Sequence, residues 1–458
     1  MELEVKCMRV LLINPPMVSA DRPGYHHLSP PLGIMYLANF LRQVDVEVRI
    51  LDLVTAHDVD LAEHVTAYRP DIVGISAMTG NFSYGVEIAV AIKSVLPVPV
   101  VFGGPHPTIM PAKVLEQNCI DYAVVGEGEI TFLELIKAQQ GGLEVGSIAG
   151  LGYKENGRIV VNGRRENIED LNTLPFPAYD LIDNDAYITD GNKFLGFRHC
   201  VMIVTRGCPG KCTFCAQHST MGRTFRAFSP KRVVDEIERL MTEYRTEGVW
   251  FKDSEFNMNR QWSLQFCEEV ISRKLDFKWT CLTRADGIDL QLARKLKEAG
   301  LEKLWIGAES GSERILHEIL NKEVSVGKVR NAFKACKSVG LQTAAFFMIG
   351  LPTETKEEIR MTFELMKELD SKPMQISIYH PLPGTELYDK YGGEEVTRNA
   401  KPEEMAFDKA CMATGPLSKE EVQIAYDEIV NYFFGDGSDP VFLLSEEQEC
   451  YSAMQGRY

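Results

Sequence analysis

The chain lacks the features that would place it in a membrane or on a nucleic acid. None of its apolar runs approaches the roughly 20 residues that span a bilayer. Acidic residues outnumber basic ones, 65 to 49, and the net charge of −16 argues against a phosphate backbone or an anionic membrane as the main partner. The first residues are acidic and show no signal-peptide order. We therefore expect a cytoplasmic protein with no membrane span and no nucleic-acid partner.

The chain also lacks a disulfide framework, because its eleven cysteines form no even set of close pairs. This pattern suits a reducing compartment, where thiolates stay available to iron. Its 458 residues are too many for one ordinary core, so we expect two large domains and an appendage. With 45% hydrophobic and 25% charged residues, the composition is that of an ordinary globular protein.

Three of the cysteines, Cys208, Cys212 and Cys215, stand close together directly after a short apolar stretch. Three thiolates on one loop can hold three irons of a cubane [4Fe-4S] cluster and leave the fourth iron open to another ligand. The alternative is a zinc site, which His218 would complete as a Cys3His set. The strand and helix pattern downstream favours the cluster, because a small zinc module has no use for it.

The first 140 residues alternate short β-rich runs with helical stretches. We expect strands at 10–13, 46–51, 72–75, 98–102 and 122–125, and helices near 34–43, 59–68, 84–95, 111–118 and 129–139. Such alternation predicts a parallel sheet with helices on both faces and a ligand site beyond the carboxyl ends of the strands. The loops expected to converge there carry Asn14, Pro16, Ser76, Met78, Gly103, Gly104 and His106.

The alternation resumes after the cysteines. We expect strands at 201–205, 248–252, 278–282, 303–307, 343–348 and 375–379, and helices near 230–245, 260–273, 289–299, 312–339 with a break near Lys322, and 355–369. Six such units predict an incomplete β/α barrel whose site lies at the carboxyl ends of its strands. The polar or flexible residues at those ends are Asp253, Glu255, Arg284, Asp286, Glu309, Ser310, Gly350, Tyr379 and His380.

The remaining segments connect or close these two domains. Residues 141–197 are expected to form a connector, with a β-hairpin that turns at Asn156 and Gly157. The barrel would then occupy residues 198–390. In the last segment, 391–458, helical apolar spacing over residues 419–434 predicts a C-terminal helical cap, either a lid or a packing helix.

Two of these patterns resemble known protein families. The Cys-x3-Cys-x2-Cys spacing, with Phe214 before the last cysteine, resembles the signature of radical S-adenosylmethionine (SAM) enzymes. The element Ser76-Ala77-Met78 and the pair Gly103-Gly104 are similar to those of the cobalamin-binding Rossmann-like domain. To about residue 390 the chain thus resembles the cobalamin-dependent (B12-binding) radical SAM enzymes that carry the cobalamin domain first.

The resemblance implies an α/β fold: a Rossmann-like cobalamin-binding domain at 1–140, a partial (β/α)6 radical SAM barrel, and a small helical C-terminal region. It implies three cofactors, namely a [4Fe-4S] cluster on the three cysteines, SAM and cobalamin. Asp253 and Glu255 would accept from the SAM amine, and Arg284 would pair with the SAM carboxylate. Glu309 or Ser310 would bond the ribose. The adenine would lie against Phe214 and the backbone around Gly350.

Several of these residues have structural alternatives. Asp253 and Glu255 would otherwise cap the next helix or pair with Lys252 and Arg260. Tyr379 and His380 are candidates for a proton acceptor or a substrate contact, against purely structural roles.

The cobalamin domain departs from its family at the lower face of the cofactor. Gly33 stands in register with the last glycine of the family motif Asp-x-His-x-x-Gly, but Pro30 occupies the histidine position. Proline cannot ligate a metal, so we expect cobalamin to bind with its base displaced and without a histidine from this motif. His26 and His27 lie nearby and remain possible ligands, whereas His106 is expected to bond the backbone of its loop. A flavodoxin-like domain without a cofactor is the alternative.

The activity that the resemblance implies is methylation of an unactivated carbon, or of a phosphorus centre. A 5'-deoxyadenosyl radical would activate a peptide side chain or small metabolite, and methylcobalamin would donate the methyl group. An external donor of flavodoxin or ferredoxin type would supply the electrons. The alternatives are a cobalamin-dependent radical SAM cyclase or ring-rearranging enzyme, and a non-enzymatic cobalamin sensor or carrier.

Overall fold

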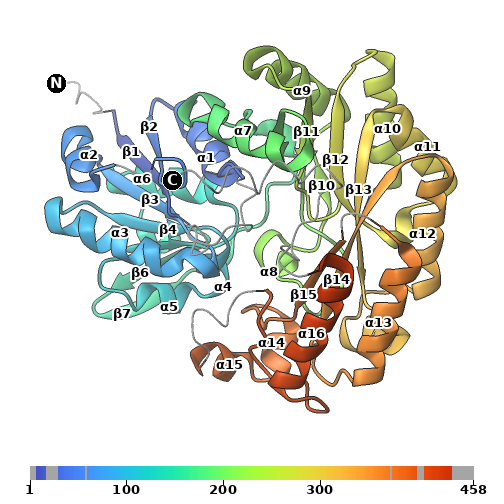
Figure 1. Ribbon diagram of the computed structural model, residues 1–458. Coiled ribbons are helices and arrows are strands. Elements are labelled where there is room, and N and C mark those ends of the chain that lie inside the picture. The colour runs from blue at the N-terminus through green and yellow to red at the C-terminus, as the bar shows by residue number, and fades with distance from the viewer. Residues whose placement is uncertain (1–6, 17–28, 57–58, 372–373, 400–406, 436–458) are drawn as a thin grey trace, which may run out of the picture. The chain divides into compact units, whose positions relative to one another are not determined.

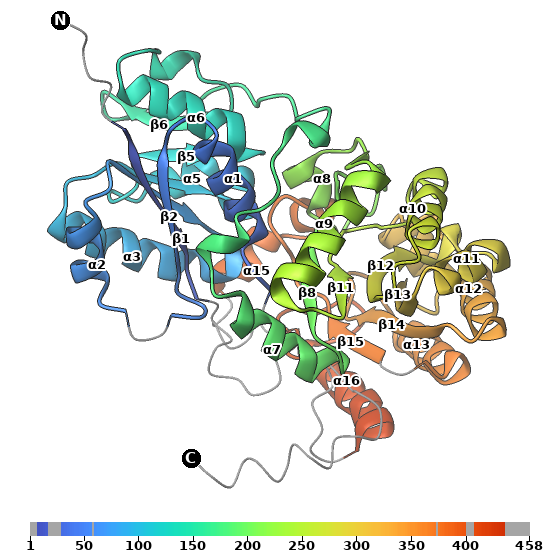
Figure 2. The same ribbon diagram turned by 90° about the horizontal axis from the view of Figure 1, so that it is seen from above.

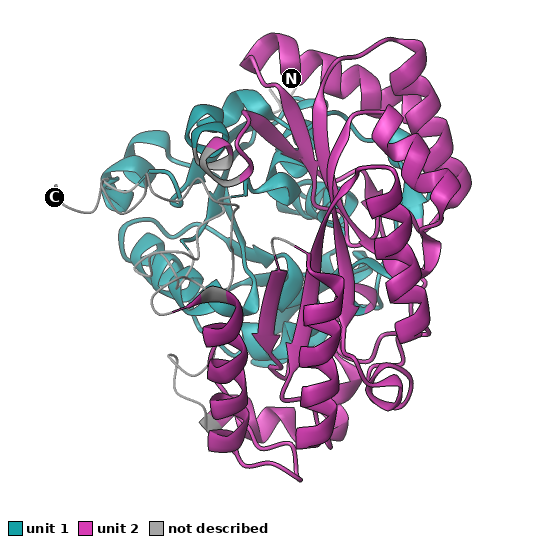
Figure 3. Cartoon of the chain, turned by 45° about the vertical axis from the view of Figure 1, so that its right-hand side comes forward, with its two compact units in different colours: residues 1–190, 219–222, 226–228 teal, residues 191–218, 223–225, 229–458 magenta. Residues whose placement is uncertain are grey.

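The computed structural model describes residues 7–16, 29–56, 59–371, 374–399 and 407–435. The chain divides into two compact units, which Figure 3 colours separately. Unit 1 comprises residues 1–190, 219–222 and 226–228, and unit 2 comprises the rest. Within the described residues, no helix is long and apolar enough to cross a membrane.

Unit 1 is built on a seven-stranded sheet in the order β2-β1-β3-β4-β5-β6-β7 (Figures 1 and 2). The strands are β1 (Arg9–Asn14), β2 (Glu47–Asp52), β3 (Ile72–Ser76), β4 (Val100–Gly103), β5 (Tyr122–Val124), β6 (Leu151–Glu155) and β7 (Arg158–Val161). The first five run parallel, as their β-rich runs separated by helices predict, whereas β6 and β7 pair antiparallel. The carboxyl ends of β1, β3 and β4 are therefore neighbours.

Helices cover both faces of this sheet. They are α1 (Leu32–Arg42), α2 (Leu61–Tyr68), α3 (Phe82–Val95), α4 (Pro105–Ile109), α5 (Pro111–Leu115) and α6 (Gly128–Gln139), whereas α7 (Asn184–Leu195) contains the boundary at residue 190. Strand β1 alternates between two cores: Leu11 and Ile13 pack with α2, α3 and α5, and Val10 and Leu12 pack with α1 and α6. Burying each such side chain contributes roughly 1.5–3 kcal/mol, so the strand alternation holds both helix layers.

The hairpin predicted at Asn156 and Gly157 forms between β6 and β7. Both turn residues have positive φ, 49° and 76°, as a tight two-residue hairpin turn requires. Strand β6 pairs with β5, so the hairpin extends the sheet of unit 1 instead of standing apart in a connector. The sequence predicted the turn because its signal is local, but not the partner strand, which lies about 30 residues away.

Unit 2 is a curled sheet of six parallel strands in the order β15-β14-β13-β12-β11-β8, which forms a half-barrel (Figure 1). The strands are β8 (His199–Met202), β11 (Gly248–Phe251), β12 (Lys278–Arg284), β13 (Leu301–Glu309), β14 (Gln342–Ile349) and β15 (Met374–Ile378). The helices between them are α9 (Pro230–Tyr244), α10 (Arg260–Ser272), α11 (Leu290–Glu298), α12 (Val326–Ser338) and α13 (Lys356–Leu369). This arrangement matches the predicted partial barrel.

The break expected near Lys322 is present. A π-helical turn (Ile315–Ile319) ends there, and α12 begins only after a short segment in which Asn321 and Glu323 have positive φ of 44° and 59°. After the barrel come α14 (Glu386–Lys390), α15 (Gly393–Asn399) and α16 (Lys419–Phe434). Helix α16 packs against unit 2 through buried Val422 and Ile429, which favours a packing helix over a free lid.

Candidate functional site

The three cysteines lie on the segment that follows β8, residues 203–216, called here the cysteine loop, which includes the two-residue strand β9 (Thr205–Arg206). A Cβ built on Gly210 would lie 3.3 Å from the Cys208 sulfur and 3.9 Å from the Cys212 sulfur, so the glycine leaves the space between them open. Burial raises the pKa of all three thiols, whereas the nearby cations of Lys322 and Arg284 oppose this shift at Cys212. Three sulfurs on an open, cation-flanked loop fit a [4Fe-4S] cluster, whose iron charge favours the thiolates.

The zinc alternative gains no support from the geometry. In the part of the chain that the structure describes, no three His, Cys, Asp or Glu side chains gather tightly enough to hold a single metal ion. His218, the fourth ligand of that alternative, lies on the short helix α8 (Gln217–Met221), and burial lowers its pKa.

Asp253 follows β11 and holds the start of the cysteine loop. Its Oδ1 accepts from the backbone N–H of Val204 at 2.9 Å and from the hydroxyl of Thr205 at 2.6 Å, and also from the Thr205 N–H. The residue is 1% exposed, and its buried Oδ2 has no hydrogen-bond partner in the part of the chain that the structure describes. Burial raises the pKa of Asp253 to about 6. One oxygen therefore braces the loop, and only Oδ2 is left for the SAM amine.

Glu255 also follows β11, two residues after Asp253, and is likewise buried. Its Oε1 accepts from the backbone N–H of Arg284 at 3.0 Å and from the Thr283 hydroxyl at 3.3 Å, both at the end of β12. Burial raises the pKa of Glu255 to about 7. Arg260, one partner of the expected structural alternative, pairs with Asp289.

Arg284 points at the cysteine loop. Its Nη1 lies 3.5 Å from the Cys212 sulfur, while Nε and Nη2 each donate to Asp286 at 3.0 Å. This paired geometry raises the pKa of Arg284 and fixes the guanidinium. The interaction also gives Asp286 a definite partner at the end of β12.

Glu309 and Lys322 form a buried ion pair beside these groups. Their side chains are 12% and 5% exposed, and Lys322 Nζ lies 2.5 Å from Glu309 Oε1. Glu309 has a positive φ of 63°, which is rare for a residue with a side chain and often marks a functional site. Lys322 was predicted from the sequence only to mark a helix break, not to be a site residue.

Ser310, the neighbour of Glu309, belongs to a different set of contacts. Its hydroxyl is fully buried, lies 3.1 Å from the Thr362 hydroxyl on α13, and accepts from the N–H of Ser312. These bonds tie the end of β13 to α13. Of the two residues expected at the ribose, Ser310 therefore has a hydroxyl that already bonds Thr362 and Ser312. The carboxylate of Glu309 lies near the cysteine loop, where its charge acts on Cys212.

Gly350 and Phe214 occupy the two positions expected around the adenine. The Gly350 N–H donates to Glu354 Oε2 at 2.7 Å, and the Leu351 N–H donates to the same oxygen at 3.1 Å. Glu354 is fully buried, its Oε1 has no partner, and burial raises its pKa to about 8. Phe214 is half-buried in the cysteine loop. Glu354 was not among the site residues predicted from the sequence, although an acid four residues after a strand-end glycine was a usable signal.

Tyr379 and His380 follow β15 and are both buried. Among the described residues the Tyr379 hydroxyl finds no hydrogen-bond partner, and burial raises its pKa. The His380 Nε2 bonds the carbonyl of Lys409 at 2.8 Å, its ring stacks on Phe407 with centroids 5.6 Å apart, and burial lowers its pKa. His380 therefore has a structural partner, whereas the Tyr379 hydroxyl has none.

The barrel sheet carries a stack of aromatic side chains. Trp250 and Trp305 lie with ring centroids 5.8 Å apart, and Trp305 and Phe346 with centroids 5.4 Å apart. They come from β11, β13 and β14 and form one apolar cluster with Ala344. Such a surface excludes water from the space it borders.

In unit 1, the three loops predicted to converge are bonded to one another. The Ala77 N–H donates to the Gly103 carbonyl at 2.8 Å, the His106 N–H donates to the Ala77 carbonyl at 3.0 Å, and Asn81 Nδ2 donates to the Pro15 carbonyl. Gly104 has a φ of 96°, and a Cβ there would lie 3.0 Å from the Ala77 carbonyl. The paired glycines thus let the β3 and β4 loops approach closely.

The expected cobalamin contacts lie on these loops or beside them. Asn14 donates to Asp52 at 2.8 Å, and Pro16 is half-buried. Ser76 is half-buried and Met78 is 46% exposed. Gly33 lies in the first turn of α1, and a Cβ there would meet nothing within 4 Å. Small, open and exposed positions at one sheet edge fit a large planar cofactor.

No described residue of the lower-ligand segment offers a histidine. Pro30 is buried, and its carbonyl accepts from the N–H of Leu32 at the start of α1. His106 Nδ1 lies 3.2 Å from the Thr79 hydroxyl, its ring packs on Phe82, and burial lowers its pKa to about 4. His26 and His27 lie outside the described residues.

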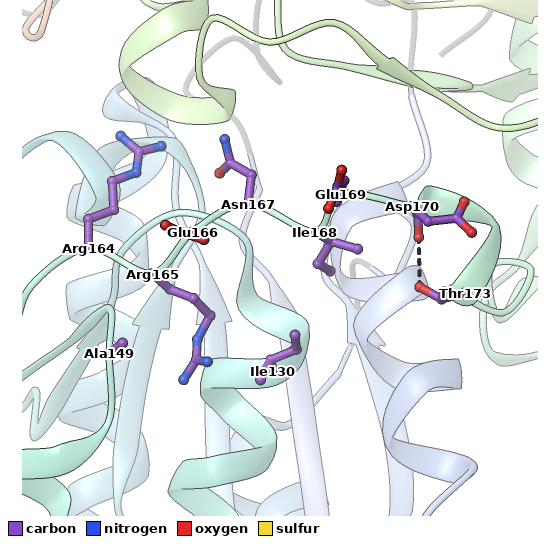
Figure 4. Close-up of a pocket in the computed structure, with 10 residues that line it drawn as sticks. All are labelled: Ile130, Ala149, Arg164, Arg165, Glu166, Asn167, Ile168, Glu169, Asp170 and Thr173. Atoms are coloured by element: carbon purple, nitrogen blue, oxygen red, sulfur yellow. Dashed lines mark hydrogen bonds between the residues drawn. The ribbon is translucent and has the colours of Figure 1, made fainter.

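A separate surface pocket of about 620 Å³ lies on unit 1 (Figure 4). Residues 164–170 line most of it, with Ile130, Ala149 and Thr173. Its cations are engaged: Arg164 donates to the carbonyls of Ser219 and Thr220, and Arg165 pairs with Glu134. None of the residues predicted to bind a cofactor lines this pocket.

Comparison with known proteins identifies the class. Residues 24–136 match the B12 binding domain, and residues 202–366 match the Radical SAM superfamily. An uncharacterised methyltransferase of Pyrococcus horikoshii is 36% identical over 390 residues, which are 84% of this chain and 83% of that protein. An anaerobic magnesium-protoporphyrin IX monomethyl ester cyclase of Cereibacter sphaeroides is 31% identical over 398 residues, 84% of this chain and 63% of that protein.

A solved structure shows the same fold. The radical SAM methyltransferase TsrM from Kitasatospora setae, solved with cobalamin and a [4Fe-4S] cluster bound, superposes with a TM-score of 0.71 at 21% identity. The match covers 86% of this chain and 78% of that one. The expected order of a B12-binding domain and a partial radical SAM barrel is thereby confirmed.

The chain is a cobalamin-dependent radical SAM enzyme. It belongs to the family in which a B12 binding domain precedes the radical SAM domain, and the matches confirm the expected class, an enzyme of the methyltransferase type. They also confirm the expected cofactors, because the two domains imply SAM, a [4Fe-4S] cluster and cobalamin. An enzyme of this class needs a reductant and a substrate.

Proposed function

We propose that the enzyme transfers a methyl group to an unactivated carbon of a peptide side chain or a small metabolite. The observation that carries this proposal is the arrangement at the carboxyl edge of the barrel sheet. There the cysteine loop, the carboxylates of Glu255 and Glu309, and the cations of Arg284 and Lys322 gather around one region of unit 2. The names of similar methyltransferases support the reaction type.

When bound, the cluster and cobalamin supply the electron and the methyl carrier of the reaction. The chain itself holds and orients SAM. Glu255 accepts from the SAM amine, Arg284 pairs with the carboxylate, and Glu309 bonds the ribose hydroxyls. Asp253 offers Oδ2 to the same amine while its Oδ1 keeps the cysteine loop in place. The adenine lies between Phe214 and the backbone at Gly350.

The remaining groups act on the substrate. The stack of Trp250, Trp305 and Phe346 gives the site an apolar wall that keeps water from a reactive carbon. The Tyr379 hydroxyl, which has no partner among the described residues, is the better candidate for a substrate contact, because burial keeps it protonated and able to donate, whereas His380 already bonds a backbone carbonyl. A donor of flavodoxin or ferredoxin type supplies the electrons.

Cobalamin is held by the loops of unit 1 around Asn14, Ser76 and Gly103, without a histidine from the Pro30 position. Gly33 leaves room for the ring, the exposed Met78 side chain would lie against it, and His106 stays in its contact with Thr79. Cobalamin bound there would supply the methyl carrier, and the chain's contribution would be to hold it through these loops while Pro30 offers no ligand.

Anaerobic incubation with methyl-labelled SAM and candidate substrates tests the proposal. Methyl transfer requires a product heavier by one CH2, with one 5'-deoxyadenosine and one S-adenosylhomocysteine formed per product. The similarity to a magnesium-protoporphyrin monomethyl ester cyclase makes cyclisation the second candidate. Product without the added CH2 and without S-adenosylhomocysteine would reject methyl transfer and support that candidate.

A further inference from the structure

We propose that Lys322 raises the reduction potential of the iron–sulfur cluster by holding a buried positive charge beside the cysteine loop, and that Glu309 limits this effect. The proposal concerns electron uptake, whichever group the enzyme then transfers. It shares with the proposed function only the binding of a cluster. Its test needs no substrate. The proposal on Lys322 can therefore fail while methyl transfer is confirmed, and methyl transfer can fail while the proposal on Lys322 is confirmed.

The segment that carries Lys322 is fastened to the cysteine loop on both sides of Cys212. The Asn321 side chain donates to the Lys211 carbonyl at 3.3 Å, and the Thr213 N–H donates to the Leu320 carbonyl at 3.0 Å. The Thr213 hydroxyl also donates to the Ile319 carbonyl. The break after the π-helical turn therefore positions Lys322 against the loop that bears the ligands.

A second connection runs through Arg284. Its Nη2 donates to the backbone carbonyl of Lys322, and its Nη1 lies 3.5 Å from the Cys212 sulfur. The two cations differ in how far a neighbouring carboxylate neutralises their charge. Arg284 is neutralised by two bonds to Asp286, whereas Lys322 has one short contact to Glu309 Oε1.

The fold makes room for this ion pair at local cost. A Cβ on Gly307 of β13 would lie 2.5 Å from Glu309 Oε1 and 2.6 Å from Lys322 Nζ, so any larger residue would displace the pair. Glycine weakens a strand, and the positive φ of Glu309 is itself unfavourable. Both features serve the same buried pair.

Because Lys322 is buried, its positive charge can act on the cluster with little screening by solvent. Solvent screens exposed charges strongly, but it screens a lysine that is 5% exposed much less. One-electron reduction adds negative charge to the cluster, so a fixed positive charge nearby stabilises the reduced form and raises its potential. Glu309 opposes this effect because its negative charge lies beside the same ammonium.

The test is a redox titration, followed by electron paramagnetic resonance, of the reconstituted full-length enzyme without SAM. Lys322→Met should shift the potential to a more negative value, and Glu309→Gln should shift it to a more positive one. The double variant should return close to the parent, because both charges are gone. Lys211→Met is the matched control: Lys211 is in the loop itself, but its side chain is 65% exposed, so its removal should leave the potential unchanged.

Iron content per chain shows whether each variant keeps its cluster. If Lys322→Met loses the cluster, two other variants test the proposal. Lys322→Arg keeps the positive charge and should retain the parent reduction potential. Glu309→Gln should still shift the potential to a more positive value, and a shift of the opposite sign would reject the proposal. Parent-like potentials in both single variants, or shifts of the same sign, would overturn the proposal. So would a shift of Lys322→Met that is seen only with SAM present, because Lys322 would then act on SAM.

Discussion

Replacing Asp253 by alanine should release the start of the cysteine loop and cost the enzyme its cluster. The side chain is 1% exposed, and its Oδ1 is the acceptor for two backbone N–H groups and one hydroxyl, all from Val204 and Thr205. Thr205 stands three residues before Cys208. Alanine would leave three buried donors without an acceptor at the point where the loop leaves β8.

The size of the effect follows from those three bonds. Each buried donor that loses its acceptor costs about 1–3 kcal/mol. Removal of a carboxylate whose pKa burial has raised to about 6 offsets part of this loss. We expect a net destabilisation of about 3 kcal/mol in the alanine variant. Asparagine keeps an oxygen acceptor at the Oδ1 position, so Asp253→Asn should cost only about 1 kcal/mol and keep the loop bonded.

Iron retention and unfolding measure the two consequences separately. After anaerobic reconstitution, the alanine variant should bind less iron per chain and lose it faster to a chelator, and its urea midpoint should fall. The asparagine variant should resemble the parent in both. Asp276→Ala is the matched control, because this aspartate is exposed and lies in the same unit just before β12.

Two results would refute parts of this reasoning. If Asp253→Ala keeps parent-like iron content and urea midpoint, Asp253 does not brace the loop. If Asp253→Asn keeps its cluster and binds SAM with parent affinity, the proposed contact between Oδ2 and the SAM amine is wrong, and bracing is the role that remains.

Four further predictions follow from the same geometry. Cys215→Ala should lose the visible charge-transfer absorption of the cluster, and retained zinc would contradict the cluster assignment. Glu255→Gln should slow 5'-deoxyadenosine formation about a hundredfold, equal to about 3 kcal/mol, with cluster and cobalamin retained and exposed Glu268→Gln as control. Electron paramagnetic resonance of the Co(II) form should show no axial-nitrogen splitting, as Pro30 predicts. Glu354→Gln should flatten the pH dependence of the urea midpoint. Burial raises the pKa of Glu354 from its ordinary value of 4.5 to about 8, so between these pH values the folded chain holds a proton that the unfolded chain has lost. As pH rises through this range, Glu354 therefore lowers the free energy of unfolding of the parent by about 1.4 kcal/mol per pH unit, and the glutamine variant lacks this contribution.

The sequence predicted the architecture closely because its signals were periodic and local. All six barrel strands appear where β-rich runs alternate with helical stretches, and their order in the half-barrel follows the chain. Helix ends were also readable: Thr355 and Glu358 form the capping box that begins α13. The pairing of the hairpin with β5 could not be predicted from the sequence, because the residues of a strand do not specify which neighbouring strand it pairs with.

The sequence placed the site residues at the correct sheet edge but did not give their contacts. Asp253 was expected to face SAM, yet its Oδ1 bonds a segment 48 residues earlier in the chain. Glu309 and Ser310 were interchangeable in the sequence, and the positive φ of Glu309 separates them in space. Strand-end position is set by the fold, whereas the direction of each side chain depends on local backbone angles that the pattern does not encode.

Lys322 shows why a charged site residue escapes sequence reasoning. Lysine is almost always exposed, so a lysine in a broken helical stretch indicates a solvated turn. Two unfavourable features nevertheless pointed to it: a glycine inside a strand at Gly307 and a helix interrupted before a Lys-Glu pair. Each is ordinary alone. The two features indicate a functional site only together, because the fold brings both to the same carboxylate, Glu309. When two locally unfavourable features surround one side chain, the side chain itself, and not the packing, is the reason that they are retained.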